Sequence, residues 1–142
     1  MNATYAFTRS RTYEHNQYAS LSPEKITLAL FDGILTFIDR ACAAIDSGHV
    51  AHRGEAVSRA LAVIGELHAT LRPEPAPELV GALSTLYDYL TRELIKANIA
   101  ADQMALMRCA GIVRTLRDGW AEMIKSLPAA AKTAAGGGGG YL

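Results

Sequence analysis

Apolar residues recur every three or four positions along four long stretches of the chain, which is the spacing of one face of an α-helix. The first stretch covers residues 22–47, and its apolar line consists of Ile26, Leu30, Ile34, Phe37, Ala41 and Ile45. Ser22 followed by Pro23 predicts the start of a helix, because serine caps free backbone N–H groups and proline fits the first turn. Gly48 is expected to end this helix.

The same spacing predicts three more helices, over about 50–71, 77–97 and 102–127. The segment RPEPAP, residues 72–77, ends the second helix because proline cannot continue one. Asp102 is a suitable N-cap for the fourth helix, and Pro128 follows its end. No stretch alternates strictly between apolar and polar residues. The sequence therefore predicts an all-α fold, an antiparallel four-helix bundle with short connections.

Length and local composition predict one domain with two irregular ends. The chain has 142 residues, of which 50% are hydrophobic, and this is enough for a single sizeable core. Residues 1–21 are polar and rich in tyrosine, so we expect a flexible N-terminal arm. Residues 22–127 form the predicted bundle. Residues 128–142 are rich in alanine and glycine and are expected to form a disordered tail.

Charge and composition exclude several classes of function. Fourteen basic residues balance fourteen acidic ones, so the chain has no electrostatic footprint for nucleic acid or for an anionic membrane. Neither a secretory signal nor a membrane-spanning segment is predicted, which indicates a cytoplasmic protein. Cys42 and Cys109 lie far apart within helical patterns and are expected to be buried free thiols in a reducing compartment.

Motifs for catalysis or metal binding are not found in the sequence. There is no Gly-x-Ser-x-Gly elbow, Walker loop or dinucleotide fingerprint, so we expect neither an enzyme nor a cofactor. A di-iron bundle requires Glu-x-x-His, whereas Glu66 and His68 are spaced so that they lie on different helix faces. His49 and His52 lie near a helix junction and His15 lies in the arm, so no metal site is predicted. We expect His68 to be partly buried with an ordinary hydrogen-bond partner.

The apolar arcs are wider than one helix–helix contact requires. The second apolar line of the first helix consists of Leu28, Phe31, Leu35, Ile38 and Cys42. The third helix has one line made of Leu79, Leu83, Leu86, Leu90, Leu94 and Ala97, and another that includes Val80, Tyr87 and Ile95. Two interpretations are open: each arc packs against two neighbours of the bundle, or part of it forms a groove for a guest helix.

Gly33 is unusual because it lies in the interior of the first predicted helix. Glycine at such a position costs about 1 kcal/mol relative to alanine. A glycine has no side chain and so permits the close approach of another backbone. We expect Gly33 to be either a close-packing point within the bundle or the floor of a groove.

Three stretches resemble the FliS family of flagellar export chaperones. They are LSPEKITLALFDGILTFIDRACAAI, LSTLYDYLTRELIKANIAAD and LRDGWAEM, and the likeness covers roughly residues 18–124. The most specific pieces are Leu30-Phe31-Asp32-Gly33, Leu86-Tyr87-Asp88-Tyr89, Ala97-Asn98 and Trp120.

The resemblance implies a chaperone that binds the disordered C-terminal segment of flagellin in apolar helix grooves. Such binding prevents premature polymerisation and aids delivery to the flagellar type III export apparatus. The candidate flagellin-binding residues are Phe31, Gly33, Leu35, Tyr87, Leu90, Leu94, Ile95 and Asn98. An N-terminal tyrosine contributes to function in the family, so Tyr5, Tyr13 and Tyr18 are candidates for an arm that regulates the groove.

An alternative function is a self-associating helical interaction module without a client. In that case the additional apolar stripe closes a homodimer. The sequence is compatible with a monomer or with a weak homodimer.

Overall fold

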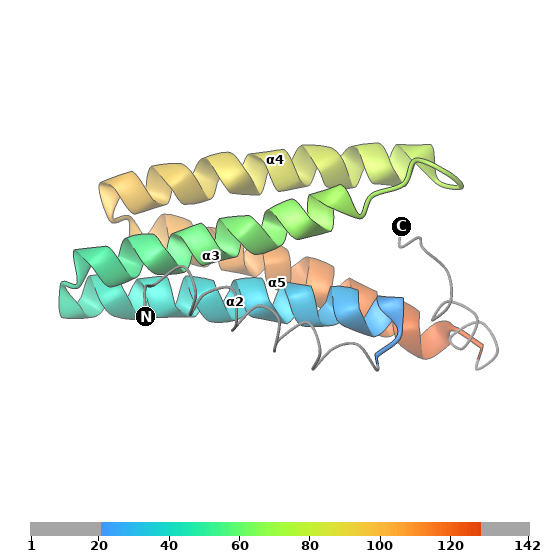
Figure 1. The fold of residues 1–142 in the computed structure, drawn as a ribbon, viewed down its shortest axis with the longest axis horizontal. Coiled ribbons are helices and arrows are strands. Elements are labelled where there is room, and N and C mark those ends of the chain that lie inside the picture. Colours follow the sequence, from blue (N-terminus) through green and yellow to red (C-terminus); the bar gives the residue numbers. More distant parts are fainter. Residues whose placement is uncertain (1–20, 129–142) are drawn as a thin grey trace, which may run out of the picture.

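The computed structural model describes residues 21–128 and contains four α-helices that run alternately in opposite directions (Figure 1). They are α2 (Pro23–Ser47), α3 (Val50–Ala69), α4 (Pro77–Ala100) and α5 (Gln103–Ser126). The prediction of an all-α, antiparallel four-helix bundle is confirmed. Residues 1–20 and 129–142, which contain nearly all of the predicted arm and tail, lie outside the described residues.

Three helix ends follow the capping residues read from the sequence, whereas α3 ends at Ala69, two residues before its predicted end, and the end of α4 is an exception of another kind. The Ser22 side chain accepts a hydrogen bond from the Lys25 backbone N–H, and the Asp102 side chain accepts one from Ala105. Gly48 ends α2 in the left-handed conformation, with φ 74°. The exception is Ala101, which ends α4 with φ 51° although alanine disfavours this conformation. Helix α4 therefore continues three residues beyond its predicted end at Ala97.

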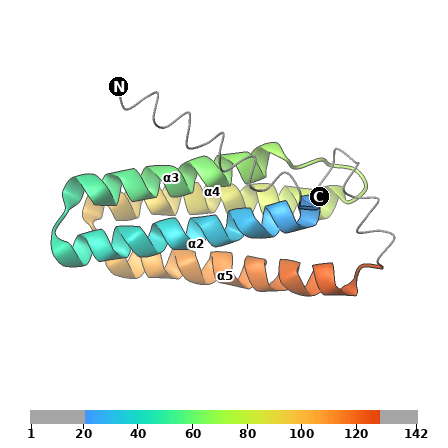
Figure 2. The same ribbon diagram turned by 60° about the horizontal axis from the view of Figure 1, so that its bottom comes forward.

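The helices form a closed ring in the order α2, α3, α4, α5, as two views of the bundle show (Figures 1 and 2). Helix α2 packs against α3 and α5, and α4 packs against the same two helices. Only residues 48–49 connect α2 to α3, and only residues 101–102 connect α4 to α5, whereas residues 70–76 connect α3 to α4. The bundle is thus two tight hairpins joined by a longer loop. Both tight turns lie at the same end, on the left of Figure 1.

The core lies along the axis of the bundle and receives side chains from all four helices. Its largest fully buried members are Ile34, Ile38, Ile64, Leu67, Leu90, Leu94, Leu106, Val57 and Val113. No helix within residues 21–128 combines the length and the hydrophobicity that crossing a membrane requires.

Two of the motifs noted in the sequence hold α2 against α5. The Phe31 ring packs edge-on against Trp120, with 6.3 Å between the ring centroids. Next to it, Arg117 Nε donates to Asp32 Oδ1 at 2.9 Å. The motif that contains Phe31 and Asp32 therefore has a structural role at the α2–α5 contact.

Candidate binding surface

The eight residues predicted to bind flagellin fall into two groups. Four of them are core residues in this structure: Phe31, Tyr87, Leu90 and Leu94 are at most 3% exposed. The other four are accessible: Ile95 is 43% exposed, and Gly33, Leu35 and Asn98 are partly exposed. A molecule that approaches this bundle from outside therefore meets only the second group directly.

Within residues 21–128, seven large apolar side chains are substantially exposed, and one of them, Ile95, is a predicted binding residue. They are Val50, Leu79, Tyr89, Ile95, Ile99, Met104 and Met107, with exposed fractions from 42% to 79%. Six of the seven lie on α4 and α5. Exposed apolar side chains are a feature of protein-binding surfaces, and flexible methionines adapt to varied partners.

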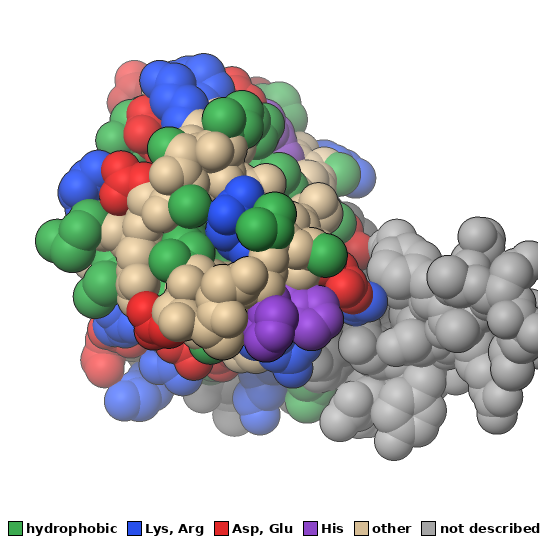
Figure 3. Space-filling view, turned by 90° about the vertical axis from the view of Figure 1, so that its left-hand side faces the viewer, with side chains coloured by type: hydrophobic (Ala, Val, Ile, Leu, Met, Phe, Trp, Pro, Cys, Tyr) green, Lys and Arg blue, Asp and Glu red, His purple; other side chains and the backbone are tan. Residues whose placement is uncertain are grey.

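Part of this apolar surface lies at the end of the bundle where the two tight turns meet. Val50 begins α3, Ile99 lies in the last turn of α4, and Met104 lies in the first turn of α5. Figure 3 looks onto this end and shows hydrophobic side chains among charged and polar ones, with histidines together at one edge. The rings of His49 and His52 are 5.2 Å apart between centroids.

The expectation that Gly33 is a close-packing point within the bundle is wrong. A Cβ atom added at Gly33 would meet no other atom within 4 Å. The same holds for Gly65, so neither glycine is required by contacts inside the bundle. Gly33 precedes Phe37 and Arg40 by four and seven residues, which places all three on one face of α2. Its alternative role as the floor of a groove remains a prediction.

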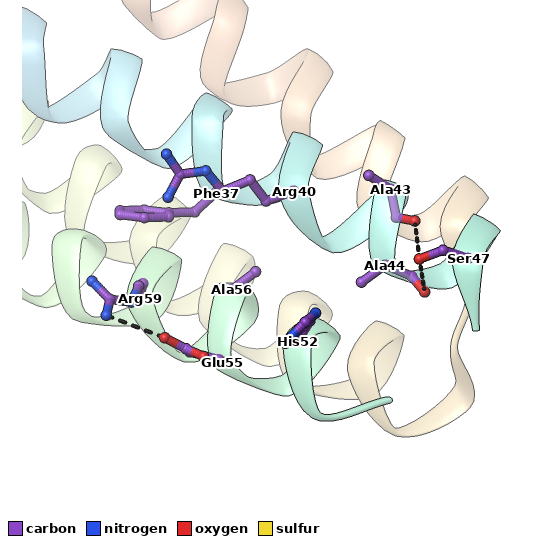
Figure 4. Close-up of a pocket in the computed structure, with 9 residues that line it drawn as sticks. All are labelled: Phe37, Arg40, Ala43, Ala44, Ser47, His52, Glu55, Ala56 and Arg59. Carbon is purple, nitrogen blue, oxygen red and sulfur yellow. Dashed lines mark hydrogen bonds and ion pairs between the residues drawn. The ribbon is translucent and has the colours of Figure 1, made fainter. Parts of the chain in front are cut away.

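A pocket of about 350 Å³ lies between α2 and α3 on this face (Figure 4). Its lining consists of Phe37, Arg40, Ala43, Ala44, Ser47, His52, Glu55, Ala56 and Arg59. The Arg40 guanidinium carbon lies 5.4 Å from the centroid of the Phe37 ring, and Arg59 Nη2 lies 3.2 Å from Glu55 Oε1. The sequence alone does not reveal this pocket, because isolated charges on a helix surface are most commonly just solvent-exposed.

Polar contacts connect α3 to α4. His68 Nε2 lies 2.9 Å from Ser84 Oγ, and His68 Nδ1 lies 3.7 Å from Asp88 Oδ1. This confirms the prediction that His68 is partly buried with an ordinary hydrogen-bond partner. Further along the same two helices, Arg53 Nε donates to Asn98 Oδ1 at 2.9 Å. Asn98, a predicted flagellin-binding residue, therefore bonds within the bundle in this structure.

The grouping of Ser84, His68 and Asp88 has the residue types of a hydrolase triad but not its setting. Ser84 lies inside α4, where the backbone N–H groups are used by the helix itself. Acyl transfer requires free donors at the position where the oxyanion develops. The three residues therefore connect two helices and do not form a nucleophilic centre.

The two cysteines are free, as predicted, with Cys109 buried and Cys42 partly buried. Burial raises the pKa of Cys109 to about 11, and it also raises the pKa of Cys42. Both thiols are therefore protonated and weakly nucleophilic at neutral pH. Within residues 21–128, no three His, Cys, Asp or Glu side chains group closely enough to hold a metal ion.

A helical bundle that exposes apolar side chains is typical of protein-binding modules. The sequence model of the family described as flagellar protein FliS matches residues 6–127. This chain belongs to the FliS family, whose members are chaperones and not enzymes.

Curated relatives agree with this membership over most of their length. The flagellar secretion chaperone FliS of Bacillus subtilis is 34% identical over 114 residues, which cover 80% of this chain and 84% of the relative. FliS of Salmonella typhimurium is 34% identical over 105 residues, covering 73% and 78% of the two chains. The flagellar secretion chaperone FliSB of Pseudomonas aeruginosa is 26% identical over 120 residues, covering 82% and 95%.

Proposed function

We propose that this protein is a cytoplasmic export chaperone that binds the disordered C-terminal segment of flagellin. Binding prevents flagellin from polymerising too early and aids its delivery to the flagellar type III export apparatus. The observation that carries the proposal is the apolar surface of α4 and α5, in a family whose curated members are named flagellar secretion chaperones.

The reason for such a surface is physical. A segment that packs between subunits in a filament must have apolar faces, and a chaperone that covers these faces blocks assembly. Ordering a disordered segment costs about 2–5 kcal/mol or more, so the contact must be extensive, of the order of 1,000–3,000 Å². Ile95 and Ile99 are four residues apart and lie on one face of α4, so they can be covered together by one segment of a client, whereas Leu79 lies at the other end of the helix on a different face.

The accessible candidate residues are proposed to contact flagellin directly. Ile95 supplies exposed apolar area on α4, and Gly33 with Leu35 supplies open surface on α2. Asn98, whose side-chain oxygen accepts a hydrogen bond from Arg53, is also proposed to contact flagellin. The buried candidates, Phe31, Tyr87, Leu90 and Leu94, are proposed to act by holding α2 and α4 in the binding geometry.

The N-terminal arm is proposed to cover the flagellin-binding surface until flagellin displaces it. The candidates Tyr5, Tyr13 and Tyr18 give this segment apolar area that an unbound polar arm does not require.

Calorimetric titration of the full chain with a C-terminal peptide of flagellin from the same genome tests the proposal. We expect saturable binding, and we expect Ile99→Ser to weaken it by about tenfold, because an exposed isoleucine covered by a partner contributes roughly 1.5 kcal/mol. Lys96→Ser, on the same stretch of α4, is the matched surface control and should bind nearly as the unmodified chain does. Failure of the unmodified chain to bind the peptide would contradict the proposal.

Self-association is the second candidate function, and it is favoured by the exposed apolar side chains at the turn end of the bundle. Light scattering at several protein concentrations, with and without the flagellin peptide, separates the two functions. A dimer that the peptide dissociates indicates a chaperone whose binding surface pairs with itself when empty. A stable dimer that the peptide does not dissociate indicates an interaction module without a client.

A further inference from the structure

The pocket between α2 and α3 lies on a separate part of the surface from the exposed apolar side chains of α4 and α5. In the ring of four helices, the α2–α3 pair is opposite the α4–α5 pair. In Figure 4 the pocket residues of α2 face those of α3 across the opening. The pocket therefore needs an explanation beyond the apolar surface already described.

The pocket combines an apolar floor with positively charged groups at its rim. Ala44 and Ala56 are buried, and the Phe37 ring supports the Arg40 guanidinium. Arg40 makes no ion pair with another residue of the range 21–128, and it lies opposite the Arg59–Glu55 pair. Arg59 is paired with Glu55, so Arg40 is the rim guanidinium that has no carboxylate partner among residues 21–128. A planar guanidinium binds a carboxylate through two parallel hydrogen bonds, so an anion of this shape fits the rim.

The size of the pocket limits what it can hold. At about 350 Å³ it is near the lower bound of small-ligand sites, which begin at roughly 300 Å³, and it is too small for a helix. It can hold one residue whose Cα atom carries both a carboxylate and an apolar side chain. Only the last residue of a chain has this arrangement, because an Asp or Glu carboxylate is itself the side chain and the backbone continues on both sides.

We propose that the α2–α3 pocket binds the free C-terminal carboxylate of the client, with the apolar side chain of the terminal residue on the floor formed by Phe37, Ala44 and Ala56. Arg40 is the main carboxylate-binding group. This inference rests on the proposed function, because it assigns a site to the end of the segment that the chaperone binds. It explains how a chaperone can select the terminus of a chain over an internal segment with similar apolar faces.

Two flagellin C-terminal peptides that differ only in their C-terminal functional group test the proposal. One has a free carboxylate and the other a carboxamide, and both are titrated calorimetrically into the full chain. We expect amidation to weaken binding about three- to tenfold, because it removes a charge-assisted contact to Arg40. Amidation also favours helix formation in a peptide, which would strengthen binding, so the expected loss cannot come from a helix effect.

Arg40→Gln and Arg114→Gln form a matched pair for the same experiment. Both residues are exposed arginines on helices, but Arg114 lies on α5, outside the pocket. Arg40→Gln should lower the affinity for the free-acid peptide to that for the amide and leave amide binding unchanged. Arg114→Gln should preserve the difference between the peptides. Circular dichroism melts of both variants confirm that the bundle is intact.

The outcomes separate this inference from the proposed function. Equal affinity of the acid and amide peptides for the unmodified chain would overturn the pocket assignment and leave the chaperone function standing. A difference that persists in Arg40→Gln would also overturn the assignment, because the carboxylate would then be bound elsewhere. Failure of both peptides to bind would contradict the function itself.

Discussion

The indole Nε1 of Trp120 donates a hydrogen bond to the main-chain carbonyl oxygen of Glu24, 2.9 Å away. This bond joins the C-terminal half of α5 to the first turn of α2, two segments that are 96 residues apart in the sequence. Trp120 belongs to one of the stretches that resemble the FliS family, and its contacts with Glu24 and Phe31 give it a structural role.

Replacing Trp120 with phenylalanine tests this role. Trp120→Phe keeps an aromatic ring but removes the donor, so the free energy of unfolding should fall by about 1–2 kcal/mol. Urea denaturation followed by circular dichroism measures the change, since the variant has no tryptophan fluorescence. Tyr89→Phe is the aromatic control, because Tyr89 is 42% exposed, and it should change stability by less than about 0.5 kcal/mol. Equal effects of the two substitutions would contradict the assigned contact.

Replacing helical glycines with alanine distinguishes effects on stability from effects on peptide binding. Gly33→Ala and Gly65→Ala should each raise the free energy of unfolding by about 1 kcal/mol, because a Cβ atom at either position has open space. If Gly33 is the floor of a groove, only Gly33→Ala should weaken binding of the flagellin peptide. Denaturant titration and calorimetry on the same two proteins measure both quantities. A loss of binding in both variants or in neither would argue against a specific role for Gly33.

Two neighbouring residues of α4 also distinguish effects on stability from effects on peptide binding. Leu94 is 0% exposed and Ile95 is 43% exposed. Leu94→Ala should therefore destabilise the bundle by about 2–5 kcal/mol, whereas Ile95→Ala should cost less than about 1 kcal/mol. Ile95→Ala should nevertheless weaken peptide binding if Ile95 contacts the client. Thermal melts and peptide titrations test the pair, and unchanged affinity in Ile95→Ala would remove this residue from the proposed site.

Because the Cys109 thiol is buried, we predict that the folded protein loses stability at alkaline pH. Burial raises the pKa of Cys109 to about 11, so the folded chain keeps a proton that the unfolded chain releases at lower pH. Stability from this group is therefore complete at neutral pH and decreases as pH rises from the ordinary thiol value towards 11. Urea titrations at pH 8, 9 and 10 should show a steeper decline for the unmodified chain than for Cys109→Ala. Identical slopes would show that Cys109 does not titrate in this way.

Removing the arm tests its proposed regulatory role. Deleting residues 1–17 removes Tyr5 and Tyr13 and should increase the association rate with the flagellin peptide, because the proposed binding surface is then uncovered. Stopped-flow fluorescence with a labelled peptide measures the rate. Deleting residues 129–142 is the control and should leave the rate unchanged. An unchanged or lower rate after deletion of the arm would contradict autoinhibition.

The helices and their order could be predicted because several local signals agreed. Ser22 with Pro23, Gly48 and Asp102 mark helix ends by short-range chemistry that the sequence displays directly. The end of α4 was placed too early because Ala101 adopts a left-handed conformation that alanine does not signal. Such a conformation is imposed by the tight connection to α5 and not by the residue itself.

The binding surface was harder to predict because core and exposed lines overlap on a wide apolar arc. Tyr87, Leu90 and Leu94 continue the same periodic pattern as Ile95, and only the positions of neighbouring helices decide which of them is covered. The pocket beside Arg40 was not found for a related reason. Its lining comes from two helices, and a sequence pattern reports one helix at a time.

Helix α4 is held less firmly than α2. It packs less extensively on α3 and α5 than α2 does on the same two helices, and the longer connection of residues 70–76 joins it to α3. The contacts of Phe31, Asp32 and Trp120, by contrast, hold α2 to α5. Hydrogen exchange should accordingly be faster for the amides of α4 than for those of α2.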